Sequence, residues 1–165
     1  MPDAFMPLPS PVGLLTLVAR GPKLAAILWE EDRPNRVRLG ELEQRHDHPM
    51  LQRTAAQLQE YFAGQRQVFD LALDFAGTEC QVQVWHALLT IPFGETRSYL
   101  DIATQLGNPK AVRAVGAANG RNPISIIAPC HRVIGSSGSL TGFAGGLPAK
   151  QYLLNLERRD LLSFQ

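Results

Sequence analysis

The chain has 165 residues, enough for one domain or two small ones, and 45% of them are hydrophobic, so it can bury a substantial core. The formal net charge is +1, but residues 1–76 carry 8 basic and 10 acidic side chains, whereas residues 77–165 carry 8 and 5. Only two cysteines occur, in no Cys-x-x-Cys pair, and no apolar run approaches the roughly 18 residues of a membrane span. We therefore expect a soluble protein of the reducing cytoplasm, with no disulfide scaffold, metal site or membrane contact.

The first half of the chain predicts a small α/β unit. Two apolar runs in "GLLTLVARGPKLAAILWEED" (residues 13–32) flank an Arg-Gly-Pro breaker and indicate a β-hairpin. Residues 49–64, "PMLQRTAAQLQEYFAG", have apolar positions at helical spacing and end on a glycine. In "VFDLALDF" (residues 68–75) the alternating pattern indicates a half-exposed strand. Residues 1–76 are thus predicted to be an N-terminal α/β domain.

The second half is predicted to be mostly helical. Thr78 and Gln81 have the spacing of a capping box, which predicts a helix over about residues 79–89. Ser98 and Asp101 have a similar relation ahead of "YLDIATQLG", which predicts a second helix.

A third helix is predicted to follow a Gly-Asn-Pro turn, with Asn108 as its cap and Pro109 in its first turn. The second and third helices have the outline of a helix-turn-helix, so residues 77–165 are predicted to form a winged-helix-like C-terminal domain. In "KAVRAVGAANG" (residues 110–120) small residues leave Arg113 projecting almost alone. Tight core packing would explain the small residues, but unpaired cations are costly to bury, which favours a nucleic-acid groove as the partner.

The segment "SIIAPCHRVI" (residues 125–134) places cysteine, histidine and arginine in a row after an apolar run that predicts a buried strand. A lone cysteine is more often a small core residue than a nucleophile. Here the adjacent imidazole and guanidinium and the loop "GSSGSLTGFAGG" favour a reactive thiol, because a free thiol with a pKa of about 8.5 needs such help at neutral pH. A phosphatase loop is excluded because Ser136 stands where it needs arginine, and no thiol-protease signature occurs.

These motifs together resemble the O6-alkylguanine-DNA alkyltransferase family, the methylated-DNA–protein-cysteine methyltransferases. "PCHRVIG" is similar to the family's active-site motif, and "RAVGAANGRNP" before it and "GFAGGLPAKQYLLNLE" after it follow the family's order. The resemblance is strong over residues 78–157 and extends to the N-terminal unit only in general layout. It implies a DNA-repair protein that flips O6-alkylguanine, and also O4-alkylthymine, out of double-stranded DNA. The alkyl group would pass irreversibly to a cysteine of the protein, once per molecule, in a monomer without a cofactor.

The resemblance also implies a role for each matching residue of the catalytic site. Cys130 is the expected alkyl acceptor, and His131, through a water, and Glu157 are expected to draw the thiol proton away. Tyr99 is expected to crowd the DNA phosphate and to donate a proton towards the departing guanine. Asn122 is expected to tie the DNA-recognition helix to the active-site strand.

Further residues are expected, on the same resemblance, to contact DNA and the alkylated base. Flipping a base costs a few kcal/mol, part of which Arg113 would offset by filling the gap in the stack. The other expected DNA contacts are Tyr99, Lys110, Ala114, Ala117 and Arg121. The expected lining of the substrate pocket is Pro129, Val133, Phe143 and Ala144.

The chain departs from the family pattern at a few positions. Cys80 stands where relatives often have phenylalanine, and we expect it to have a core role. Phe143 replaces a frequent tyrosine and Ala144 a serine of some members, which is tolerable if the loop contacts the base through backbone N–H groups. His86 is expected on the surface.

Two other classes of protein fit the sequence less well. A damage sensor on the same scaffold would lack the acceptor cysteine, which is present here as Cys130. A transcriptional helix-turn-helix module would need no Pro-Cys-His-Arg segment and would normally use a bulkier, polar recognition helix.

Overall fold

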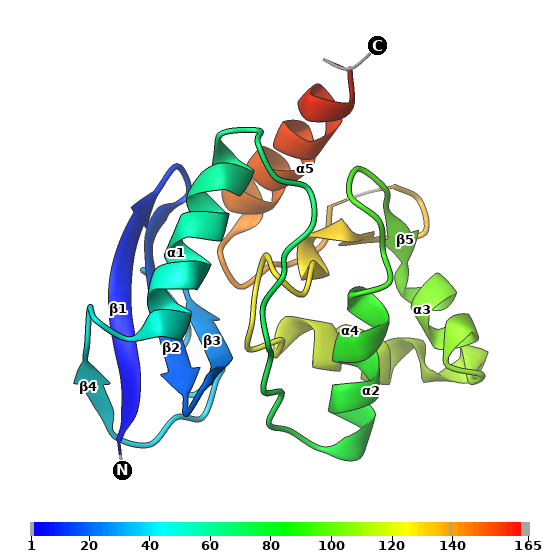
Figure 1. Ribbon diagram of the computed structural model, residues 1–165. Coiled ribbons are helices and arrows are strands. Elements are labelled where there is room, and N and C mark those ends of the chain that lie inside the picture. Colours follow the sequence, from blue (N-terminus) through cyan, green and yellow to red (C-terminus); the bar gives the residue numbers. More distant parts are fainter. Residues whose placement is uncertain (1, 139, 163–165) are drawn as a thin grey trace.

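The structure is a computed structural model that describes residues 2–138 and 140–162. Figure 1 shows a sheet with helix α1 on one side of the molecule and helices α2, α3 and α4 on the other. The predicted α/β class, with strands first and helices after them, is confirmed. No helix within the described residues is long and apolar enough to cross a membrane.

The sheet has the strand order β3-β2-β1-β4. Its strands are β1 (Asp3–Ser10), β2 (Gly13–Arg20), β3 (Lys23–Leu28) and β4 (Leu42–Gln44). The pairs β1/β2 and β2/β3 are antiparallel and β4 runs parallel to β1. The predicted hairpin is confirmed as β2 and β3, whose turn uses the positive φ of 56° at Gly21, a conformation that glycine adopts without steric cost.

Strand β1 contains two prolines, which made a strand at this position hard to predict. Pro7 and Pro9 cannot donate backbone hydrogen bonds, so in sheets proline is confined mainly to edges. Here β4 pairs only with Asp3–Phe5, and Pro7 and Pro9 therefore lie where the outer side of β1 has no partner strand within the described residues. The missing N–H groups cost no ladder hydrogen bond at this edge.

Helix α1 (Pro49–Phe62) covers one face of the sheet, as predicted from its apolar spacing. Leu51, Ala55 and Leu58 are buried in the main core cluster, which includes the inner faces of β1 and β2. The opposite face of the sheet is covered by a smaller cluster that includes Val37 and Leu39 from the β3–β4 connection.

The remaining elements form the helical part of the fold. They are α2 (Glu79–Leu88), β5 (Arg97–Ser98), α3 (Tyr99–Gln105), the 3₁₀ turn η1 (Pro109–Ala111), α4 (Val112–Gly120), the 3₁₀ turn η2 (Cys130–Arg132), β6 (Val133–Ile134) and α5 (Leu147–Leu162). Both predicted capping boxes are present, with Thr78 as the N-cap of α2 and Ser98 as the N-cap of α3. Strands β5 and β6 pair in parallel and join α3 to the segment that carries the cysteine.

The predicted start of the third helix is confirmed only in part, because Asn108 and Pro109 begin the 3₁₀ turn η1 and not the α-helix itself. The side chain of Asn108 makes no capping hydrogen bond, and a 3₁₀ turn precedes α4. Pro109 disfavours the helical conformation in the residue before it, and Asn108 has φ −139° and ψ 78°. The helix therefore begins one turn later, at Val112.

The predicted strand over residues 68–75 does not form. Leu73 makes an isolated bridge with Leu24, at the edge of β3. The alternation of the sequence still has a physical basis, because Phe69, Leu71 and Phe75 pack partly buried against the main core. The chain only crosses the edge of the sheet here. The alternating pattern therefore reflects the burial of one side of the segment, and no ladder of strand hydrogen bonds forms.

The predicted buried strand over residues 124–128 is also wrong. Ile124 bridges Ile27, and the chain then turns, with a positive φ of 74° at Ile126. Every residue of the segment is buried, as the apolar sequence indicated. A short buried apolar run does not distinguish a strand from other buried backbone by periodicity alone.

The expected core role of Cys80 is contradicted, because Cys80 is exposed. The buried face of α2 starts only at Val84, so the first turn of the helix projects beyond the core. His86 is exposed, as expected.

Candidate active site

Asn122 closes the loop that leads to Cys130. Its amide Nδ2 donates to the carbonyl of Ala128 at 2.8 Å, and its Oδ1 accepts from the N–H of Ile124 at 3.1 Å. One buried side chain thus satisfies backbone groups at both ends of the turn. The closed turn directs the chain into η2, where Cys130 is 3% exposed.

The sheet holds this loop from the other side. The N–H of Ile27 donates to the carbonyl of Pro123 at 2.9 Å, and Trp29 Nε1 donates to Ser125 Oγ at 3.1 Å. Arg36 Nη1 donates to the carbonyl of Asn122 at 2.6 Å, and the rest of the guanidinium is paired with Asp32. The position of Cys130 therefore depends on residues that lie about a hundred positions earlier in the chain.

Glu157 on α5 lies at the centre of a buried network. Its Oε2 is 2.7 Å from His131 Nε2 and accepts from Tyr61 OH at 2.6 Å. Arg132 donates twice, from Nε to Oε1 at 2.8 Å and from Nη2 to Oε2 at 3.0 Å. The N–H of Gly94 lies 3.3 Å from Oε1. The carboxylate is 1% exposed, and these donors replace the water that burial removes.

The network fixes the protonation of its members. Burial alone would raise the pKa of Glu157, but hydrogen bonds from His131 and Arg132, together with their charges, hold this pKa well below its usual value. Burial lowers the pKa of His131, although Glu157 opposes the shift. His131 is therefore neutral at pH 7 and donates its Nε2 proton to the carboxylate. Its Nδ1 is buried without a hydrogen-bond partner among the described residues, so the lone pair of this nitrogen can accept a proton.

The buried environment of Cys130 favours the protonated form of its thiol. Burial raises its pKa, and this effect exceeds the opposing influence of hydrogen bonds from Asn122 and Ser125 and of the charges of Arg36 and Lys150. The nearby cations therefore do not by themselves lower the pKa of the thiol below its usual value. A thiol in such an environment needs a base to take its proton before it can act as a nucleophile.

A cleft of about 610 Å³ lies between the helices and the loop that follows Cys130. Its lining residues are Arg33, Tyr99, Gly116, Ala117, Gly120, Arg121, Gly142, Phe143 and Ala144. The hydroxyl of Tyr99 hydrogen-bonds the hydroxyl of Thr141, which ties α3 to the loop. Lys150 holds strand β6, which precedes this loop, because its buried Nζ donates to the carbonyl of Val133 at 2.7 Å.

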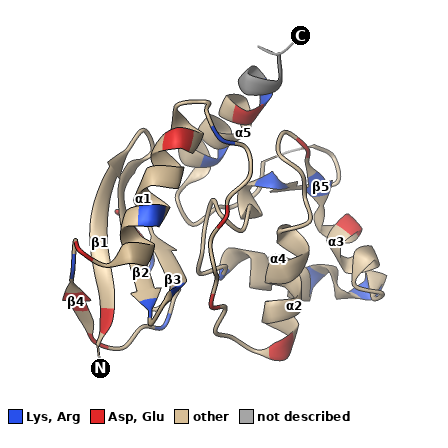
Figure 2. Ribbon diagram, viewed as in Figure 1, with Lys and Arg blue, Asp and Glu red and all other residues tan. Residues whose placement is uncertain are grey.

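Helix α4 presents an exposed surface beside this cleft. Arg113, Ala114 and Ala117 are exposed, as are Lys110 before the helix and Arg121 after it. The helix carries no acidic residue (Figure 2). Its buried side packs on α2, where Trp85 Nε1 donates to the carbonyl of Ala118 at 2.8 Å. The small exposed side chains therefore leave the backbone of α4 accessible.

The structure brings together most, but not all, of the residues predicted for the site. Tyr99, Ala117, Arg121, Phe143 and Ala144 line one cleft. Cys130, His131, Asn122 and Glu157 form the buried layer of the site. Two predicted pocket residues do not line this cleft, because Pro129 lines a different cavity of about 310 Å³ and Val133 is fully buried in the cluster that also contains Cys130.

Several residues of the site had no signal in the sequence. Tyr61 resembles any aromatic residue on an amphipathic helix, and Lys150 resembles a surface lysine, yet both are fully buried. Trp29 and Arg36 lie far from Cys130 in the chain, and only their contacts with the loop reveal their importance. Within the described residues, no group of three or more histidine, cysteine or acidic side chains could hold a metal ion.

Cys130 lies in a buried cluster against which Tyr99 and Phe143 of the cleft pack, and the exposed helix α4, which carries no acidic residue, borders the same cleft. Residues 79–159 match the family model "6-O-methylguanine DNA methyltransferase, DNA binding domain", and residues 6–75 match that family's "ribonuclease-like domain". The chain belongs to the 6-O-methylguanine DNA methyltransferase family. The resemblance drawn from the sequence motifs is thereby confirmed.

Individual relatives agree with this assignment. A methylated-DNA–protein-cysteine methyltransferase of Mycolicibacterium paratuberculosis is 53% identical over 150 residues, which cover 91% of this chain and 89% of the relative. One of Methanosarcina barkeri is 58% identical over 107 residues, covering 65% of this chain and 68% of the relative. The crystal structure of Mycobacterium tuberculosis OGT in complex with DNA has a TM-score of 0.85 and 47% identity, and covers 98% of this chain and 99% of that one.

Proposed function

We propose that Cys130 is the alkyl acceptor of this DNA-repair methyltransferase and that His131 is the base that activates it. The observation that carries the proposal is the orientation of His131, whose Nε2 is held by Glu157 while its buried Nδ1 has no partner among the described residues. A neutral imidazole fixed in this way accepts a proton from the thiol, directly or through a water.

The reaction has a simple balance of bonds. Duplex DNA binds along α4, Arg113 enters the stack, and the alkylated nucleotide rotates into the cleft beside Tyr99. The thiol proton of Cys130 passes to His131, and the sulfur attacks the alkyl carbon. The new carbon–sulfur bond replaces the bond from that carbon to guanine O6, and the departing guanine takes a proton from Tyr99, which the proton held by His131 then replaces through water. Because thioethers are stable in water, each molecule acts once.

The proposed substrates are O6-alkylguanine and, with the same geometry, O4-alkylthymine in double-stranded DNA. We also propose that the protein is a monomer and acts in the cytoplasm, where a free thiol stays reduced. The proposal also includes a division into an N-terminal unit (residues 1–76) and a DNA-binding, alkyl-accepting unit (residues 77–165). The two separate family matches, which end and begin near this boundary, support the division.

Intact-protein mass spectrometry tests the proposal. After incubation with an excess of O6-methylguanine duplex, the protein should gain one methyl group, located on Cys130 by peptide mapping. Cys80→Ala is the matched control, because it removes the exposed cysteine and should still gain one methyl group. Cys130→Ala should bind DNA and gain none. Methylation of Cys130→Ala, or repeated turnover by one molecule, would contradict the assignment.

A further inference from the structure

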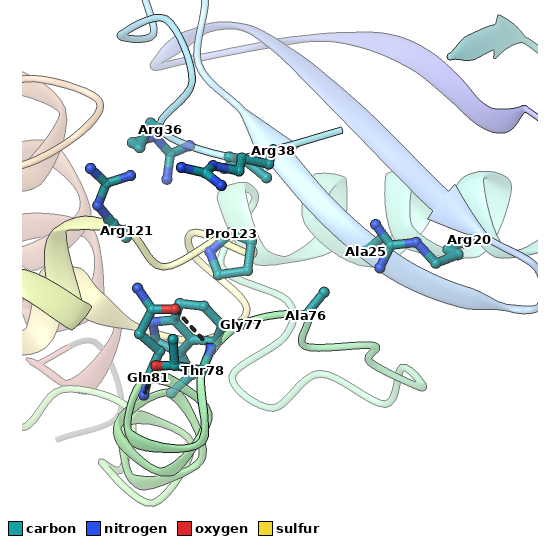
Figure 3. A pocket seen from close by; sticks show the side chains of 12 residues that line it. Arg20, Ala25, Arg36, Arg38, Ala76, Gly77, Thr78, Gln81, Arg121 and Pro123 are labelled. Atoms are coloured by element: carbon teal, nitrogen blue, oxygen red, sulfur yellow. Dashed lines mark hydrogen bonds between the residues drawn. The ribbon is translucent and has the colours of Figure 1, made fainter. Parts of the chain in front are cut away.

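A second cavity, of about 470 Å³, lies between the sheet and the start of α2 and has no role in the proposed reaction. Its lining includes Ala25 on β3, Thr78 and Gln81 at the N-terminus of α2, and four arginines: Arg20, Arg36, Arg38 and Arg121. Figure 3 shows Arg36, Arg38 and Arg121 gathered at one end of the cavity and Arg20 at the other. No acidic residue is among the described residues that line it.

The four cations are not equally neutralised. Arg36 is buried and paired with Asp32 at 2.6 Å. Arg20 has distant partners, Asp3 and Asp74, each at 3.5 Å.

Arg38 and Arg121 are exposed, and in the part of the chain that the structure describes neither side chain forms a hydrogen bond or an ion pair. Two uncompensated guanidinium groups beside a cavity without acidic lining create a positive potential that attracts an anion.

The cavity is continuous with the proposed DNA surface through one residue. Arg121 lines both this cavity and the substrate cleft. It also follows directly after α4, in line with the exposed side chains of Arg113 and Ala117 at intervals of four residues. A cationic path therefore leads from α4 across Arg121 to Arg38, which belongs to the sheet unit.

We propose that this second cavity binds a backbone phosphate of the DNA and that the sheet unit thereby extends the DNA-binding surface beyond α4. The inference rests on the proposed DNA-repair function and concerns a contact that the reaction at Cys130 does not require. A guanidinium matches a phosphate in charge and in its paired donor geometry. Such a contact positions the duplex without reading its sequence.

The salt dependence of DNA binding tests this inference. Each phosphate that a protein neutralises contributes about −0.9 to the slope of log affinity against log salt concentration for duplex DNA. Arg38→Gln should make the slope less negative by roughly that amount and weaken binding to an undamaged, fluorescently labelled duplex by about threefold or more at low salt. Arg38 has no partner to lose among the described residues, so the variant should keep its thermal unfolding temperature.

Arg53→Gln is the matched control. It removes the same charge from the same unit, but Arg53 is on α1, which packs on the other face of the sheet, and it pairs with Asp70. A change in slope equal to that of Arg38→Gln would show an effect of net charge and overturn the inference, as would an unchanged slope for Arg38→Gln.

Inorganic phosphate provides the second arm of the experiment. If phosphate raises the unfolding temperature of the wild type but not of Arg38→Gln, while the slope for DNA is the same in both, the cavity is a site for small anions and the DNA assignment is wrong. Alkylation of the wild type by free O6-benzylguanine, which has no backbone phosphate, tests the chemistry at Cys130 separately. Failure of the proposed function and failure of this inference are thus distinguishable.

Discussion

A carboxylate that is 1% exposed needs compensation for its lost hydration, and Glu157 receives it from four neighbours. Arg132 supplies the opposing charge, His131 and Tyr61 donate hydrogen bonds, and the backbone of Gly94 approaches as well. The same carboxylate that orients the base His131 thus compensates a buried arginine. In the proposed function, Glu157 therefore serves both alkyl transfer and the stability of the fold.

The substitution Glu157→Gln should therefore reduce both the rate of alkyl transfer and the stability of the fold. The amide keeps the shape but leaves the charge of Arg132 without its partner, which costs roughly 3 to 5 kcal/mol in buried pairs. The imidazole of His131 becomes a weaker base because the carboxylate no longer raises its pKa. We expect alkyl transfer to slow by roughly 10- to 100-fold and its pH profile to shift upward. Urea unfolding and single-turnover rates between about pH 6 and 9 measure the two effects.

The same substitution should change the response to acid. The folded-state pKa of Glu157 lies below its usual value of 4.5, so the unfolded chain takes up this proton first as the pH falls. The stability from Glu157 is present above about pH 4.5 and is lost progressively below it. Glu157→Gln has no proton to take up here and should lose stability less steeply below pH 4.5. Equal slopes in the two proteins would show that Glu157 does not titrate in this way.

At the scale of elements, α4 and the loop after Cys130 form the two sides of the substrate cleft. Helix α4 contributes Gly116 and Ala117, and the loop contributes Phe143 and Ala144. The proposed function assigns the helix to contacts with DNA and the loop to contacts with the alkylated base. Substitutions in α4 should consequently slow transfer from duplex DNA more than transfer from the free base, whereas substitutions in the loop should slow both.

Arg113→Ala should slow repair of duplex DNA far more than transfer from free O6-benzylguanine. Arg113 is exposed on α4, where it can fill the gap left by a flipped nucleotide, and the free base needs no flipping. Losing part of the few kcal/mol that flipping costs corresponds to about 10-fold or more in rate. Parallel measurements on both substrates decide the matter, since equal losses would indicate a structural role for Arg113.

Substitution by alanine should have different effects on stability at two glycines of the loop. A Cβ on Gly145 would lie 2.6 Å from the ring of Trp29, whereas a Cβ on Gly142 would meet nothing within 4 Å. Gly145→Ala should displace the loop from Trp29, lower stability by roughly 1 to 3 kcal/mol and slow transfer. Gly142→Ala is the control for stability only, because Gly142 lines the cleft although a Cβ there would meet nothing within 4 Å, and it should unfold at the wild-type temperature. Thermal unfolding and transfer rates of both variants would show whether the close packing on Trp29 shapes the cleft.

At the scale of the whole molecule, the sheet is the support on which the active-site loop rests. Trp29 contacts both parts of the site, because it donates to Ser125 in the loop before Cys130 and packs edge-on against Phe143 in the loop after it, at 5.3 Å between ring centroids. Ile27 and Arg36 hold the backbone of the first loop as well. The sheet unit thus fixes the geometry of a site to which it contributes no reacting atom.

Trp29→Phe should reveal this support. The variant keeps an aromatic ring but loses the hydrogen bond to Ser125, at a cost of about 1 kcal/mol. Transfer from free O6-benzylguanine should slow, because the loop before Cys130 is less restrained. Trp85→Phe is the control, since it loses a comparable buried hydrogen bond, to Ala118 of α4, without touching that loop. If both variants transfer from the free base at the same rate, Trp29 acts only through stability.

Short-range patterns in the sequence determined the elements whose cause is local. The hairpin of β2 and β3, the helix α1 and the capping boxes at Thr78 and Ser98 depend on residues a few positions apart, and they formed as predicted. The order of the motifs around Cys130 likewise sufficed to indicate the family. Local chemistry specifies such features before the chain folds.

The tertiary structure alone decided the rest, because its causes join distant residues. Tyr61 meets Glu157 across 96 positions, and Arg36 meets Asn122 across 86, so no window of sequence contains these contacts. The loop at Ile126 turns where periodicity predicted a strand, since the side chain of Asn122 satisfies the backbone that a ladder would otherwise pair. The protonation of Cys130, His131 and Glu157 depends on burial and on charges that folding brings together. Solvent exclusion acts only in the folded chain, so the sequence named the cysteine and histidine while the fold set their chemistry.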